Sequence, residues 1–214
     1  VVHVNCFVML AGYFAIDREF QSGRILRLWR QVAFYSMMIC LVWGCWKGVT
    51  GRDVLTAVLP ISSRNYWFAS VYMGLVLLMP FAGMLTARLS RRQYRYLLIL
   101  LGLFFSVNHM IFRADTYGIF TGRDLSWFLF RALLAGYLKL PTRQERRYFW
   151  YGLGGYVLAS LGVLASVYLS VELHLEDMGY FLNYNSPLAL AATVSLFVCV
   201  KNMPWREGCL DNVI

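Results

Sequence analysis

Long runs without charged residues dominate the pattern of hydrophobic and polar positions along this chain. Six such runs are 16 to 24 residues long, and a seventh is interrupted only by Arg131 and Lys139. A helix that crosses a bilayer needs about 20 mainly apolar residues, and tilt or snorkelling flanks accommodate shorter ones. The pattern therefore predicts an all-α, polytopic transmembrane helix bundle that forms a single integral-membrane domain over residues 1–214. The seven predicted helices lie at about 2–16, 28–46, 66–86, 96–112, 125–140, 148–171 and 182–200.

The basic residues alternate between the two sides of this predicted bundle. Fourteen Lys and Arg lie in the loops after the first, third, fifth and seventh helices, and five lie in the loops of the other side. Cytoplasmic loops are enriched in Lys and Arg. We therefore expect the N-terminus outside and a multi-pass protein of the cell membrane.

Composition also favours a membrane protein over a soluble one. Of the 214 residues 59% are hydrophobic and 14% charged, against about 25% charged in soluble domains. The net charge of +9 is explained by the cytoplasmic loops, so we expect no nucleic-acid partner. The five cysteines have no metal-ligand or disulfide spacing, and we expect neither a metal site nor a bound cofactor. Because the chain starts at Val1 without an initiator Met, we expect it to be part of a longer protein.

Three arginines open the second predicted helix. Arg24, Arg27 and Arg30 are spaced by three residues, so each lies beside the next on a helix. Guanidinium groups bind phosphates through paired hydrogen bonds, and such a row at the cytoplasmic surface suits a phosphate-bearing donor such as coenzyme A. The alternative is an anchor that contacts lipid headgroups.

Arg131 lies inside the fifth predicted helix. Charged residues within a membrane are costly and face a polar cavity, a carboxylate or an anionic substrate. Snorkelling along its own helix is the alternative interpretation. Arg131 could stabilise negative charge in a transfer reaction.

Histidines and aromatic residues supply the remaining candidates. His109 lies near the outer end of the fourth predicted helix and could move a proton; His3 and His174 are weaker candidates. Trp67 and Tyr72 open the third predicted helix, where they form an aromatic belt or a surface on which a sugar stacks. In the sixth helix, small residues at near-helical spacing predict close packing: Gly155, Ala159, Gly162 and Ser166.

Several segments resemble the acyltransferase-3 family of membrane-bound acyltransferases, in order over nearly the whole chain. Gly12-Tyr13-Phe14 is similar to the end of the family's second helix, and Arg24-Ile-Leu-Arg27-Leu is similar to the basic motif that opens its third. Further similarities to its Gram-positive surface-sugar acetyltransferases lie at Leu59-Pro60 with Tyr66-Trp67-Phe68, Tyr72 and Pro80-Phe81, at Trp127-Phe128 with Gly136-Tyr137, and at Asn185-Ser186-Pro187.

The resemblance implies a bacterial O-acyltransferase that moves an acyl group, expected to be acetyl, from acyl-CoA to a sugar hydroxyl of a cell-surface glycan or lipid-linked sugar. It implies that Arg24 and Arg27 bind the donor, and Trp67 and Tyr72 are the acceptor candidates. The resemblance implies that the family's first helix, with its Arg and His, and its last helices lie outside this chain. The catalytic residues are therefore unknown, with His109 and Arg131 as candidates, and the chain alone is expected to be inactive.

Two other functions fit the sequence. A transporter or flippase for an anionic glycan or lipid explains Arg131 and the helical core equally well. A membrane scaffold without catalysis predicts no polar cavity at all. Whether the chain binds acyl-CoA, and whether its cavity crosses the membrane near Arg24, discriminates the acyltransferase from the transporter.

Overall fold

The computed structural model describes residues 1–18, 20, 22–61, 66–112, 121–140, 146–173 and 182–203, and within these residues the chain is helical without strands. The predicted all-α bundle is therefore confirmed. The elements are α1 (Val2–Ala15), α2 (Ser22–Lys47), α3 (Gly51–Val58), α4 (Trp67–Ala87), α5 (Arg91–Gly102), the π-helix η1 (Leu103–Asn108), α6 (His109–Phe112), α7 (Leu125–Lys139), α8 (Arg146–Glu172) and α9 (Pro187–Lys201).

Each predicted span coincides with a helical segment of the described structure. Four segments are long and apolar enough to cross a membrane: Ser22–Lys47, Trp67–Ala87, Arg91–Phe112 and Arg146–Glu172. α1 and α9 are shorter apolar helices, and α7 has 15 residues.

Some predicted boundaries were wrong. α2 begins at Ser22 rather than 28 and α5 at Arg91 rather than 96. In both cases basic residues continue the helix beyond the apolar run, because long cationic side chains reach water from a helix end. α9 begins at Pro187 rather than 182, since proline is favoured in the first helical turn.

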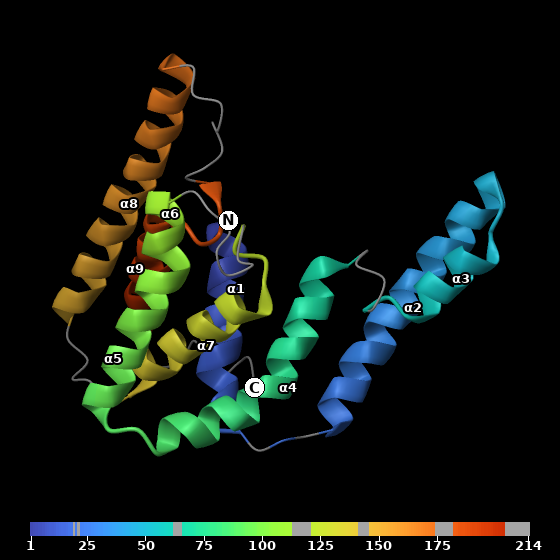
Figure 1. The fold of residues 1–214 in the computed structure, drawn as a ribbon, viewed down its shortest axis with the longest axis horizontal. Helices are drawn as coiled ribbons and strands as arrows, with labels where there is room; N and C mark the ends of the chain where they lie inside the picture. The colour runs from blue at the N-terminus through green and yellow to red at the C-terminus, as the bar shows by residue number, and fades with distance from the viewer. Residues whose placement is uncertain are drawn as a thin grey trace.

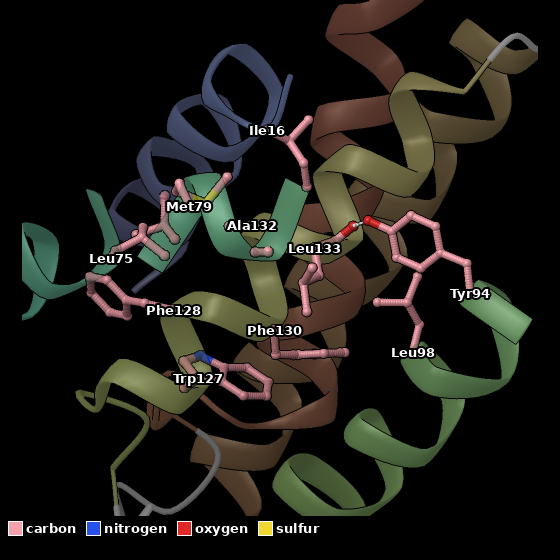
Figure 2. Packing of buried hydrophobic residues seen from close by; sticks show 12 residues of the cluster. Ile16, Leu75, Met79, Tyr94, Leu98, Trp127, Phe128, Phe130, Ala132 and Leu133 are labelled. Carbon is pink, nitrogen blue, oxygen red and sulfur yellow. Dashed lines mark hydrogen bonds between the residues drawn. The ribbon is translucent and has the colours of Figure 1, made fainter. Parts of the chain in front are cut away.

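α7 lies at the centre of the bundle (Figure 1), where α1, α4 and α5 contact it. α9 packs on α1 and α8, and α8 lies along α9 at one side. Figure 2 shows side chains of α7 pointing in several directions into the core, among them Trp127, Phe128, Phe130 and Leu133. α2 and α3 form an arm on the opposite side of α4 from this core.

Small residues allow the central helices to approach closely. A Cβ added at Gly12 of α1 would lie 2.7 Å from the Cβ of Ala132 on α7. The expected packing face of α8 is also present, since a Cβ at Gly155 would lie 2.7 Å from the Ser195 hydroxyl of α9. These contacts bring backbones together without large side chains, as in other membrane bundles.

Three local features modify the helices. Thr50 and Asp53 form a capping box that starts α3. Pro80 lies within α4, and Figure 1 shows α4 bending along its length. η1 was not predicted, because a π-turn leaves no trace in the hydropathy pattern.

Candidate functional site

The main candidate site is a cavity of about 280 Å³ between α1, α4 and the beginning of α2. We call it the inner cavity, because it opens beside the expected cytoplasmic loop between α1 and α2. Its lining is mostly apolar, and Arg18, Arg24 and Tyr72 are its polar members. The apolar members are Ala11, Phe14, Ala15, Phe20, Ile25, Leu75, Val76, Met79 and Pro80.

Helix ends and a glycine shape this cavity. The N–H of Arg18 donates to the carbonyl of Ala15 at 3.0 Å, so the chain turns at the end of α1 and places Arg18 at the cavity. Gly83 of α4 contacts the carbonyl of Ile16 so closely that no Cβ fits there. The contact holds α1 against α4 beside the cavity.

The structure separates the three arginines of α2. All three are exposed, but Arg24 lines the inner cavity, whereas Arg27 and Arg30 are not among its lining residues. Arg18 takes the place beside Arg24 that sequence spacing suggested for Arg27. Helical spacing predicts neighbours on one helix and cannot show which arginine of a preceding loop folds back toward it.

Two other cavities suit a phosphate less well. A cavity of about 250 Å³ between α1, α4, α5 and α7 has Arg91 but also Asp17, whose carboxylate pairs with Lys139 at 2.6 Å. A cavity of about 320 Å³ between α1 and α9 is apolar apart from Cys6, Tyr13 and Lys201, and Lys201 donates to the carbonyl of Leu138. The inner cavity combines two arginines with no carboxylate among its lining residues.

The two acceptor candidates lie in different surroundings. Tyr72 lines the inner cavity, and its ring stacks on Phe68 at 5.9 Å. Trp67 lies at the start of α4, 5.8 Å from the ring of Tyr184, and the guanidinium of Arg123 lies over its ring. Phe68 lies between the two candidates, since the Trp67 ring is 5.8 Å from the Phe68 ring on which Tyr72 stacks.

Arg131 is fully buried, which excludes snorkelling along α7. One terminal nitrogen donates to the carbonyl of Tyr184 at 2.9 Å, and the guanidinium lies over the Trp127 ring at 4.7 Å. Its Nε and Nη1 have no hydrogen-bond partner within the described part of the chain. Arg131 is also not among the residues that line the inner cavity.

The carbonyl of Tyr184 is the centre of a buried polar cluster. Asn5 of α1 also donates to it, at 3.3 Å. The next carbonyl, of Asn185, accepts a hydrogen bond from Ser106 of η1 at 2.7 Å. A buried charge is expensive unless a polar group meets it, and the carbonyl of Tyr184 is the group that accepts a hydrogen bond from Arg131 here. Sequence reasoning missed this cluster, because its members lie far apart in the chain.

The structure describes the side chain of one of the three histidines. His3 is exposed in the first turn of α1. His109 begins α6, but its side chain lies outside the described residues, as does the whole of His174. Among the described residues no group of His, Cys, Asp and Glu could hold a metal ion.

Comparison with known families gives one match. The model of the Acyl_transf_3 family, described as an acyltransferase domain, matches residues 1–210. No curated protein and no solved structure matches significantly. Because the match covers nearly all of the helical bundle described above, the chain belongs to the acyltransferase-3 family of membrane acyltransferases.

Proposed function

We propose that the protein is a multi-pass O-acyltransferase of the cell membrane. It takes an acyl group, acetyl in our proposal, from acyl-CoA at the cytoplasmic face and delivers it to a sugar hydroxyl of a surface glycan or lipid-linked sugar outside. In this reaction the hydroxyl oxygen attacks the thioester carbonyl, a C–O bond replaces the C–S bond, and the hydroxyl proton ends on the sulfur of coenzyme A.

The observation that carries this proposal is the combination of charges and shape in the inner cavity. The donor has a narrow pantetheine chain that ends in the thioester and is joined to a nucleotide with several phosphates. A mostly apolar cavity bordered by Arg18 and Arg24 offers space for the pantetheine chain and charge-assisted hydrogen bonds for a phosphate. Arg27, exposed one turn further along α2, adds attraction at the cytoplasmic surface.

Tyr72 gives the cavity a polar group that comes from α4. Tyr72 and Pro80 lie on α4, eight residues apart, and both line the cavity. Eight helical residues span about 12 Å, so the cavity extends along α4 toward the outer half of the bundle. This depth supports a route by which a cytoplasmic donor brings its acyl group toward the outer acceptor.

Donor binding tests the proposal. Purified protein in nanodiscs is titrated with acetyl-CoA and with acetylpantetheine, which has the same pantetheine chain and no phosphate. Arg18→Gln and Arg24→Gln should each weaken acetyl-CoA binding by about tenfold or more, since each removes a charge-assisted hydrogen bond. Binding of acetylpantetheine should be weak and unchanged in both variants.

Two matched variants on the same helix act as controls. Arg27→Gln should have a smaller effect than Arg24→Gln, and Arg30→Gln should have none, although each removes one positive charge. If acetyl-CoA affinity fell equally in all of these variants, the arginines would attract anions only through their summed charge and would not form a specific donor site. Absence of acetyl-CoA binding would contradict the donor site and favour the transporter for an anionic glycan.

A further inference from the structure

Trp67, Arg123 and Tyr184 form a compact group at the expected outer end of the bundle, which we call the outer platform. The guanidinium of Arg123 lies 5.4 Å from the ring centre of Trp67 and 5.7 Å from that of Tyr184. The two rings are 5.8 Å apart. A guanidinium held over aromatic rings is stabilised by their π-electrons.

Backbone contacts fix the outer platform in place. The N–H of Tyr184 donates to the carbonyl of Thr121 at 3.1 Å, which joins the two loops that carry the platform. Gly122 has a φ of 67°, and a Cβ there would lie 2.7 Å from the backbone nitrogen of Asn185. Only glycine suits this left-handed and crowded position.

The buried polar cluster around the Tyr184 carbonyl also holds the segment that carries the Tyr184 ring. Arg131 and Asn5 both donate to the carbonyl of Tyr184, and the ring of that residue belongs to the outer platform. A site whose side chains are held before the ligand arrives loses less conformational entropy on binding. The outer platform is therefore preorganised, although Arg123 itself is exposed.

The position of Arg123 changes what the platform can bind. A sugar that stacks on Trp67 or Tyr184 needs a free ring face, and the guanidinium already covers one face of each. Its N–H groups remain at the edge of the guanidinium, where they can bind a carboxylate or phosphate in a paired geometry. Within the described ranges no carboxylate forms an ion pair with Arg123.

We propose that the outer platform binds an anionic group of the acceptor glycan, so that the protein selects sugars that carry a carboxylate or phosphate over neutral ones. This inference rests on the proposed function, because it names the class of its acceptor. The guanidinium of Arg123 binds the anionic group, while Trp67 and Tyr184 hold the guanidinium in place.

Binding of two sugars that differ only in charge tests the inference. A galacturonic acid tetrasaccharide and its methyl ester are titrated, without any acyl donor, into the protein in nanodiscs of zwitterionic lipid. The acid should bind about tenfold or more tightly than the ester, since its carboxylates accept charge-assisted hydrogen bonds. Arg123→Gln should abolish this preference, and binding of the ester should stay equal or increase because the ring faces are uncovered.

Two variants separate recognition from folding. Arg52→Gln removes an exposed positive charge from α3, also at the expected outer side, and should keep the preference. Arg123→Lys keeps the charge but loses the planar pair of donors, and should retain part of the preference. Equal binding of acid and ester, no binding of either, or an equal loss in Arg52→Gln would overturn the inference.

The lipid headgroup is the other source of an anionic group at this depth. In nanodiscs that contain phosphatidylglycerol, the acid should still bind more tightly than the ester. If phosphatidylglycerol abolishes the difference, Arg123 binds headgroups and the inference fails. Because no acyl donor is present, either outcome leaves the donor test at Arg18 and Arg24 independent.

Discussion

α7 and α2 are both apolar helices, but they occupy opposite environments. α7 has 15 residues, and eight of them are buried, from Trp127 to Gly136. α2 has 26 residues, and its buried residues are Ala33 and Ser36. Leu41 and Trp46 of α2 are 64% and 90% exposed. The shorter helix is the centre of the core, and the longer one forms an arm.

The difference teaches that hydropathy reports the ability to enter a membrane and not the degree of burial. Lipid tails are as apolar as leucine, so a helix surrounded by lipid needs no fewer apolar residues than one surrounded by protein. What distinguishes α7 is close backbone contact, as at Gly12 and Ala132, and internal polar bonding. The hydroxyl of Tyr94, for example, donates to the carbonyl of Leu133 at 2.6 Å (Figure 2).

The two helices also differ in how they carry positive charge. α2 places Arg24 in its first turn, where the side chain is exposed and lines the inner cavity. α7 encloses Arg131 completely. In our proposals an exposed arginine binds a ligand that arrives from water, whereas a buried one orders the segment that carries the outer platform.

The largest expected effect comes from a side chain placed between α1 and α7. Gly12→Leu should lower the free energy of unfolding by about 3 kcal/mol or more, since overpacking of a closed core forces the backbones apart. Thermal unfolding of the purified protein, followed by size-exclusion chromatography, measures this change.

A glycine of α2 gives the matched control. Gly23 has no heavy atom within 4 Å of an added Cβ, so Gly23→Leu should leave stability nearly unchanged. If both variants unfolded at the same temperature, the contrast between core helix and arm would be wrong.

Arg131 provides the second test, with an intermediate effect. Arg131→Ala should lower the free energy of unfolding by about 2–4 kcal/mol, because it leaves a cavity and removes the hydrogen bond to Tyr184. Arg131→Met keeps the volume without the charge, and should change it by less than about 1 kcal/mol, since apolar replacements of buried charges are often neutral.

The same two variants distinguish a structural role from a functional one. If Arg131 orders the outer platform, the Met variant should stay folded but weaken the preference for the acidic tetrasaccharide. A Met variant that kept the full preference would show that the buried charge does not act on the platform.

Much of the fold could be predicted from the sequence, because charge-free runs and basic loops are local patterns. The site was less predictable for a physical reason. Arg18 lies in a loop between two spans, and only the fold brings it to Arg24. Trp67 is a good stacking residue by type, but Arg123, more than fifty residues later, covers its ring. No local pattern records such long-range contacts.

The smallest expected effect concerns the arm and is a dependence on pH. The hydroxyl of Thr50 donates to the Asp53 carboxylate at 2.6 Å and its N–H donates at 2.9 Å. These hydrogen bonds lower the pKa of Asp53 below its ordinary value. A carboxyl whose pKa is lower in the folded state stabilises that state above the unfolded pKa of about 4, and the contribution disappears as the pH falls through the folded pKa.

Hydrogen exchange of the α3 amides, corrected for intrinsic rates, measures this contribution where it acts. Protection of α3 should be constant from pH 7 to about 5 and should fall below about 4. Thr50→Val should lower the protection of α3 above pH 5 and weaken its decrease at lower pH, because the hydroxyl that lowers the pKa of Asp53 is gone. Protection of α7 should follow neither change, since α3 packs on α2 and not on the core. A parallel fall in α3 and α7 would mean that the arm and the core unfold as one unit.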